Sequence, residues 1–397
     1  MKLSKKIEAC ELSPIRKFYP YASAAQKRGI RIHHLNIGQP DIQTPPAYFE
    51  AIANYRETVL AYAPSPGIPP LIAAVQRYYA RLGVPLDEDD ILITTGGSEA
   101  LLMTMLCILD EGSEVLIPEP FYPNYHSFVS MAGGKIRPIQ TAPEDGYRFA
   151  RREQIVPQIN QNTRAILITN PGNPTGTVLT QEELGLIAQI AVEHDLYLIC
   201  DEVYREFIYD GGELTTAARL PGIEENLVLI DSVSKRFSAC GARIGALITR
   251  NRKLMAGVTK LSQARLSVAT LDQVGAAALY SVPADYFEQT REEYQRRRDV
   301  CYRKLLEIPG VVTCEPKGAF YTMAKLPVDD AEDFQMFLLK EFEDNGETVM
   351  FAPGSGFYAT PGAGVSEIRI AYVRCEEELE RALELLRIAI ERYQNRK

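Results

Sequence analysis

The sequence predicts an α/β fold, in which a mainly parallel β-sheet is covered by helices and followed by a smaller α+β region. Two features of the pattern indicate this. From about Asp89, short apolar runs alternate with segments of helical periodicity, and after about Pro283 long charged helices and isolated strands replace that alternation. Apolar strands that alternate with helices are typical of parallel sheets, which are buried on both faces.

The apolar runs of the first region have the length of buried strands. They lie at residues 91–94, 114–117, 165–169, 196–200, 227–230 and 244–249. Helical spacing separates several of them, as in 99–109, where positions 101, 102, 105, 106 and 109 are apolar, and in 181–194. We therefore expect strand and helix to follow one another through this region.

The second region predicts a different order of elements. It has a charged helix over 286–308, strands over 311–313 and 319–323, a helix over 331–344, strands near Val349 and Ile368, and a last helix over 376–393. Chain ends often pack together, so the N-terminal residues are expected to join this region. We predict a large α/β domain over 43–283 and a small α+β domain formed by 1–42 with 284–397.

Charge and hydropathy exclude some classes of partner. The 397 residues carry a formal net charge of -9, which argues against nonspecific nucleic-acid binding, since that requires a basic surface. No apolar run reaches the ~18–20 residues that span a bilayer, so no membrane partner is expected. The N-terminus lacks the apolar core of a signal peptide.

Cysteine and histidine spacing bears on compartment and metals. The seven cysteines include no CxxC pair, which favours reduced thiols in a cytoplasmic protein. The four histidines show no metal-binding spacing such as HExxH, so we expect no metal.

A lysine follows one of the predicted strands directly. Lys235 ends the segment that begins at Asp231, after the strand at 227–230. At the carboxyl edge of an α/β sheet, where such folds bind ligands, a desolvated lysine is a nucleophile toward aldehydes. Taken alone, this segment is more typical of a surface lysine in a loop.

Three other strand ends carry polar groups. Asp201 follows 196–200, and a carboxylate there is suited to a protonated pyridine nitrogen or to a helix N-cap. The turn 170–176 follows 165–169 and is by itself only a rigid turn. Gly96, Gly97 and Ser98 open a helix and offer free N–H groups to a phosphate, to which Arg243 adds positive charge.

In this order, the four strand ends resemble the class I aminotransferases, the fold type I family of pyridoxal-phosphate (PLP) enzymes that contains aspartate aminotransferases. The resemblance extends from about residue 14 to the C-terminus. Its most specific part is the segment Ser232 to Lys235 with Arg243 eight residues after the lysine. The other matching segments are 36–41, 62–67, 96–100, 120–122, 173–176, 201–204, 243–245 and 368–371.

The resemblance implies a role for each matching position. Lys235 is the Schiff-base lysine and moves the α-proton, and Asp201 binds the pyridine nitrogen of PLP. Tyr204 and Asn173 bind the phenolic oxygen, and Tyr122 stacks on the ring. The implied phosphate ligands are Gly97, Ser98, Ser232, Ser234 and Arg243, with Tyr62 from the neighbouring subunit of a homodimer. Arg369 holds the substrate α-carboxylate, helped by Gly38 and Asn173.

The sequence departs from the family pattern at two places that concern the substrate. Ala242 replaces an aromatic residue before Arg243, and Leu71-Ile72 replaces a Leu-Arg pair. The implied activity is a ping-pong transfer from an L-amino acid, expected to be aspartate, to a 2-oxo acid, expected to be 2-oxoglutarate. A PLP lyase or synthase of the same fold, or an aminotransferase with another donor, shares every cofactor contact. A PLP-binding transcriptional regulator would need a DNA-binding extension, which we do not expect here.

A preference for dicarboxylates requires a second cation besides Arg369. The sequence offers Arg265, shortly after the lysine segment, as a candidate. A solvated helix arginine is the alternative interpretation of Arg265.

Overall fold

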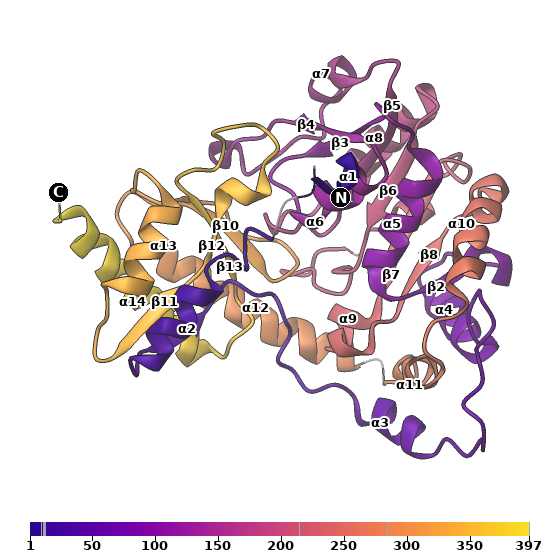
Figure 1. Cartoon of the computed structure of the whole chain (residues 1–397), viewed down its shortest axis with the longest axis horizontal. Coiled ribbons are helices and arrows are strands. Elements are labelled where there is room, and N and C mark those ends of the chain that lie inside the picture. The colour runs from indigo at the N-terminus through magenta and orange to yellow at the C-terminus, as the bar shows by residue number, and fades with distance from the viewer. Residues whose placement is uncertain (9, 11–12, 214, 284, 397) are drawn as a thin grey trace.

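A seven-stranded sheet forms the centre of the larger part of the molecule in the computed structural model (Figure 1). The structure describes residues 1–8, 10, 13–213, 215–283 and 285–396. Across the sheet the strands are β2 (Ile91–Thr94), β8 (Gly245–Ile248), β7 (Leu227–Ser232), β6 (Tyr197–Asp201), β5 (Thr163–Thr169), β3 (Glu114–Pro118) and β4 (Lys135–Ile139). Only β8 runs antiparallel to its neighbours in this sheet, which confirms the mainly parallel α/β fold.

Helices cover both faces of this sheet, because successive strand residues point to opposite sides. Ala165 and Leu167 pack toward α5 (Gly96–Ile108), α6 (Asn124–Met131) and α10 (Arg252–Arg265). Ile166 and Ile168 pack toward α4 (Pro69–Arg81), α8 (Gln181–Glu193) and α11 (Thr270–Leu279). Thr180 begins α8 with a capping box, since its Oγ1 accepts from the Glu183 amide at 3.2 Å. The shorter helices of this part are α3 (Pro46–Ala53), α7 (Arg152–Ile155) and α9 (Val233–Arg236).

The C-terminal part builds two smaller sheets and its own core. The first sheet joins β12 (Ala352–Pro353), β13 (Glu367–Ala371), β10 (Tyr321–Lys325) and β9 (Val312–Thr313), and the second pairs β1 (Arg31–His34) with β11 (Glu347–Met350). Its helices are α12 (Asp285–Leu306), α13 (Ala331–Lys340) and α14 (Glu376–Gln394). In Figure 1, α2 (Tyr19–Lys27) lies beside α13, whereas α1 (Lys5–Glu8) lies near α6. The predicted domain boundaries remain a prediction.

The long helix α12 connects the two cores. At its start, the Phe287 ring lies 5.5 Å from the ring of Phe237, just after α9. Farther along, Tyr294 packs on Phe320 with ring centroids 5.3 Å apart. Within the described residues, no helix is both long and apolar enough to cross a membrane.

Two predicted elements end earlier or begin later than the pattern suggested. The helix expected over 331–344 ends at Lys340, before a turn in which Asn345 and Gly346 take positive φ. The strand expected from 319 begins at Tyr321, because Ala319 has a φ of 56°, which a strand does not accommodate.

Candidate active site

The predicted strand-end residues meet at one edge of the seven-stranded sheet. β5, β6 and β7 run parallel, and they end at Thr169, Asp201 and Ser232. α9, which carries Lys235, follows β7 at once, and the first turn of α5 follows β2. Because parallel strands place their carboxyl ends together, the lysine, the carboxylate, the polar turn and the helix N-terminus share this edge.

Lys235 points toward the N-terminal segment that crosses the edge. Its Nζ donates to the Gly38 carbonyl at 3.0 Å and lies about 6 Å from the ring centres of Tyr204 and Phe320. No carboxylate of the described chain forms an ion pair with it. A Cβ on Gly38 would lie 1.8 Å from the Tyr321 hydroxyl oxygen, so only glycine fits there. The amine therefore lies beside aromatic rings without a direct ion pair, and the nearby carboxylate that its charge acts on is Asp201, whose pKa it lowers against the larger effect of burial.

Asp201 is a buried carboxylate with two hydrogen-bond donors. The Tyr125 hydroxyl donates to its Oδ2 at 2.7 Å, and the Val203 amide donates to its Oδ1 at 3.3 Å. Burial raises the pKa of Asp201 to about 6, although both hydrogen bonds favour the ionised form. Sequence reasoning missed Tyr125, whose position three residues after Tyr122, in the first turn of α6, was the available signal.

A chain of hydroxyl and amide groups connects Asn173 with Lys235. The Asn173 amide nitrogen donates to the Tyr204 hydroxyl at 3.4 Å, and that hydroxyl lies 3.1 Å from the hydroxyl of Tyr321. The Tyr321 hydroxyl is also 3.5 Å from the Gly38 carbonyl that accepts from Lys235. These five residues are therefore joined by one chain of polar contacts. Tyr321 was not predicted, because nothing in its local sequence marks a polar role.

Arg369 is a buried cation with spare hydrogen-bonding capacity. Its Nη1 donates to the Asn173 side-chain oxygen at 3.1 Å, and its Nη2 donates to the Asn36 carbonyl at 2.8 Å. Its Nε is buried without a partner in the described structure, and no described carboxylate pairs with it. The guanidinium lies between the rings of Tyr321 and Phe357, at 4.5 Å and 4.9 Å. A guanidinium of this kind is suited to an incoming carboxylate.

The first turn of α5 and the start of β8 form a crowded cradle for an anion. A Cβ on Gly96 would lie 2.4 Å from Arg243 Nη2, and one on Gly245 would lie 2.5 Å from the Gly96 carbonyl carbon. Arg243 donates from Nη1 to the Cys240 carbonyl at 3.0 Å, and in the described chain no carboxylate pairs with it. Gly97 and Ser98 belong to the same helical turn, whose amides carry positive partial charge.

Two serines complete this cradle, and Tyr122 packs beside the tyrosine that donates to Asp201. Ser232 Oγ donates to Ser234 Oγ at 2.8 Å and accepts from the Ser234 amide at 3.1 Å. Tyr122 packs edge-on against Tyr125 at 5.6 Å, and its hydroxyl accepts from the Asn124 side chain at 2.8 Å. Burial raises the pKa of Tyr122 to about 12, so the ring is neutral.

A buried ionic network supports α9 from behind. Arg236, next to Lys235, pairs with Asp231, which also accepts from the Tyr79 hydroxyl at 3.0 Å. Arg205 donates to that hydroxyl at 2.7 Å and pairs with Glu202 at 2.7 Å. Because Asp231 is the penultimate residue of β7 and Glu202 follows β6, the network fixes the strand end that precedes Lys235 and the one that carries the Asp201 carboxylate.

Two predicted residues do not join the others within this chain. The Tyr62 side chain is 81% exposed. Arg265 forms an ion pair with Glu99 at 3.4 Å and donates to Ser262 Oγ at 3.0 Å. The positive charge of Arg265 is therefore already matched by a carboxylate.

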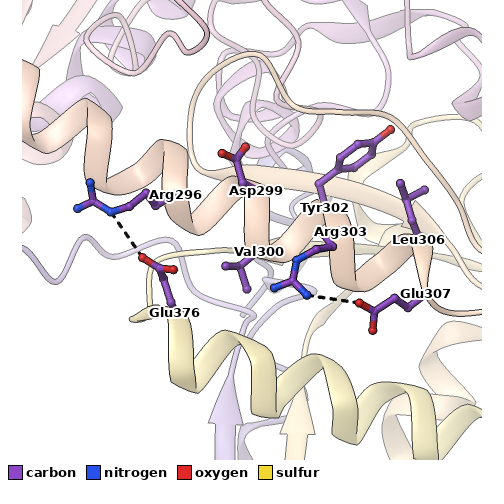
Figure 2. A pocket seen from close by; sticks show the side chains of 8 residues that line it. All are labelled: Arg296, Asp299, Val300, Tyr302, Arg303, Leu306, Glu307 and Glu376. Atoms are coloured by element: carbon purple, nitrogen blue, oxygen red, sulfur yellow. Dashed lines mark hydrogen bonds and ion pairs between the residues drawn. The ribbon is translucent and has the colours of Figure 1, made fainter.

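The structure also contains a pocket that is separate from the strand-end residues. It has a volume of about 630 Å³ and is bordered by α12 and α14. Figure 2 shows that its guanidinium groups already have carboxylate partners, Arg296 with Glu376 at 3.5 Å and Arg303 with Glu307 at 3.4 Å. It contains none of the strand-end residues, so it is not the candidate active site.

The strand-end site defines a class of protein. A lysine without a direct ion pair, a buried carboxylate, an anion cradle and a neutral tyrosine suit a cofactor with an aldehyde, a pyridine nitrogen and a phosphate, which is the chemistry of PLP. Comparison with known proteins identifies the family of this chain. Residues 31–386 match the family described as aminotransferase class I and II, and the chain belongs to that family. Enzymes of this family depend on PLP.

Relatives match this chain over nearly its whole length. The aspartate aminotransferase of Bacillus subtilis is 30% identical, over 99% of this chain and 100% of its own. The aromatic-amino-acid aminotransferase 2 of Thermococcus litoralis is 33% identical, over 97% of each chain. A solved structure of Thermus thermophilus aspartate aminotransferase with maleate has a TM-score of 0.89 and 29% identity, over 98% of this chain and 100% of that one.

Proposed function

We propose that this aminotransferase moves the amino group of an L-amino acid, with aspartate as donor, to a 2-oxo acid, with 2-oxoglutarate as acceptor. The observation that carries the proposal is the buried Arg369, whose Nε has no partner and whose neighbour Asn173 leads through Tyr204 to the space at Lys235. An amino acid held there by its α-carboxylate presents its Cα toward the lysine.

The strand-end residues take the following roles in this proposal. Lys235 attaches PLP covalently and moves the proton on the substrate Cα. When bound, PLP supplies an electron sink for the charge that develops at that carbon. Asp201 meets the pyridine nitrogen, and Asn173 and Tyr204 donate to the phenolic oxygen. The phosphate binds among Gly97, Ser98, Ser232, Ser234 and Arg243, while the Tyr122 ring covers the pyridine and Gly38 borders the substrate.

Two half-reactions would make up a ping-pong scheme. In the first, Lys235 would move the Cα proton, the amino group would stay with the cofactor, and water would supply the oxygen of the departing 2-oxo acid. In the second, the acceptor enters on the same Arg369 and the lysine returns the proton to its Cα. One set of residues serves both steps because both substrates are α-carboxylates.

A homodimer is part of the proposal. Exposed apolar side chains occur in α3, in the segment after it and directly after α10, namely Phe49 at 60%, Val59 at 71%, Leu60 at 61% and Leu266 at 52% exposure. The Thr270 hydroxyl donates to the Ala61 carbonyl at 2.9 Å, which holds the two segments together. Exposed apolar side chains of this kind favour an interaction surface, and a second copy on it would receive Tyr62. The seven free cysteines favour a reducing compartment, so we place the enzyme in the cytoplasm.

A half-reaction screen tests the proposed donor. The PLP-loaded protein is mixed with single amino acids in the absence of acceptor, and loss of the absorbance of the lysine-bound cofactor is followed. Conversion of bound PLP to pyridoxamine phosphate, fastest with aspartate, is the expected result. Release of ammonia or of an unsaturated product without pyridoxamine phosphate would instead assign a lyase.

A further inference from the structure

We propose that Arg16 selects dicarboxylic substrates, by holding the side-chain carboxylate of an amino acid whose α-carboxylate lies on Arg369. This inference rests on the proposed function and names its substrate class. It assigns the second cation to the N-terminal segment, because Arg265 already pairs with Glu99 at 3.4 Å.

The segment around Arg16 is packed on the wall of the site. A Cβ on Gly356 would lie 2.3 Å from the Pro14 Cβ, so Pro14 rests directly on that glycine. The next residue, Phe357, covers the Arg369 guanidinium at 4.9 Å. Arg16 is therefore two residues away from a contact that borders the α-carboxylate site.

The chain that follows Arg16 is also held in place. Lys17 pairs with Glu332, and the same carboxylate accepts from the Ser355 hydroxyl at 2.8 Å. Phe18 is buried, with 3% exposure, against α13 and β1. Anchors before and after Arg16 hold its backbone beside the turn that carries Phe357, at the border of the α-carboxylate site.

Tyr122 is close to both Arg16 and the turn beside Arg369. The Phe121 amide donates to the Phe357 carbonyl at 2.8 Å, which places Tyr122 next to the turn that carries Phe357. The charges of Arg369 and Arg16 both lower the pKa of Tyr122, against the larger effect of burial. The two guanidinium groups therefore act on the same ring, which forms a side of the site.

Arg16 has no counter-charge in the described structure. It is exposed, and no ion pair joins it to a carboxylate of the described residues, whereas its neighbour Lys17 has one in Glu332. A dicarboxylate between Arg369 and Arg16 would pair both cations at once. A neutral side chain would gain nothing from Arg16, so the residue discriminates between substrates without being required for the reaction.

The test compares Arg16→Gln with the matched variant Lys17→Gln, which removes the same charge one position away. Single-turnover rates are measured for aspartate, glutamate and alanine, without acceptor, together with dissociation constants for succinate and butyrate. Arg16→Gln should lower the efficiency with aspartate and the affinity for succinate by about 10- to 100-fold, the range of one partly exposed charge-assisted hydrogen bond. Alanine and butyrate should change less than about twofold, and Arg16→Lys should recover part of the loss.

Failure of this inference is distinguishable from failure of the proposed function. Wild-type protein that converts no amino acid would overturn the aminotransferase assignment itself. Active wild-type protein whose Arg16→Gln variant loses aspartate and alanine equally, or loses neither, would remove Arg16 from specificity. Arg16 would also be removed from specificity if wild type showed no preference for dicarboxylates, or if Lys17→Gln produced the same selective loss of aspartate activity.

Discussion

Asp201→Asn should stabilise the protein freed of PLP, although it should damage the enzyme. The cost of burying this carboxylate is visible in its pKa, raised from 3.8 to about 6. At about 1.4 kcal/mol per pH unit, that shift corresponds to roughly 3 kcal/mol against the folded state once the group is ionised. The Asn side chain fits the site, because its oxygen can accept from Val203 and its nitrogen can donate to the Tyr125 hydroxyl, which lies 2.7 Å from Thr169 Oγ1.

The pH dependence has a definite sign. The folded carboxyl binds its proton more tightly than the unfolded one, so the penalty is absent below about pH 4, grows between about pH 4 and 6, and is complete above. The free energy of unfolding of PLP-free wild type should therefore fall relative to Asp201→Asn through that window. At pH 7.5 the variant should be more stable by up to about 3 kcal/mol.

Urea unfolding of the two PLP-free proteins at several pH values measures this difference. Circular dichroism and tyrosine emission are suitable probes, because the chain has no Trp and 21 Tyr. Asp231→Asn is the control, since it removes the partner of the buried Arg236 and should destabilise the protein. Equal stabilities of wild type and Asp201→Asn at pH 7.5, or a difference that does not change with pH, would refute the reasoning.

Three further predictions concern the site and its support. Lys235→Ala should abolish amino-group transfer, and near-normal turnover in a steady-state assay would contradict its role as the base. Arg236→Met leaves the buried Asp231 with Arg205 at 3.9 Å as its remaining cation, which should cost about 3–5 kcal/mol in the urea-derived free energy of unfolding, and a loss below about 1 kcal/mol would show that the pair with Arg236 is not needed. Mixing Tyr62→Phe subunits with Lys235→Ala subunits should give hybrids with one intact site, so a mixture less active than the Tyr62→Phe protein alone would argue against a shared site.

Apolar periodicity was sufficient to predict most of the central sheet. Six of its strands are short buried runs, and the sequence pattern locates them within a few residues. The edge strand β4 was not predicted, because Lys135, Arg137 and Pro138 interrupt its apolar character. An edge position accommodates such residues, since one side of the strand needs no partner and proline removes a donor there. A local pattern cannot show which strand will be at the edge.

The residues of the candidate active site were also predictable only in part. Lys235, Asp201 and Arg369 were predictable because each lies in a segment that carries a specific resemblance. Tyr321 and Phe357 were not, because their importance comes from contacts with Gly38 and Arg369, which are far away in sequence. Contacts of this kind depend on how the C-terminal sheet is placed against the central one, and periodicity holds no information on that placement.

The antiparallel direction of β8 restricts changes in chain length between Lys235 and Arg243. A strand that runs against its neighbours begins where they end, so the residues just before β8 reach the same edge as those just after β7. Lys235 and Arg243 are thus the two ends of one short loop, and their spacing is set by chain length instead of sheet register. A single insertion or deletion between them would move the amine relative to the anion cradle even if every strand stayed in place. Gly245 adds a second constraint, because a side chain there would push away the first turn of α5.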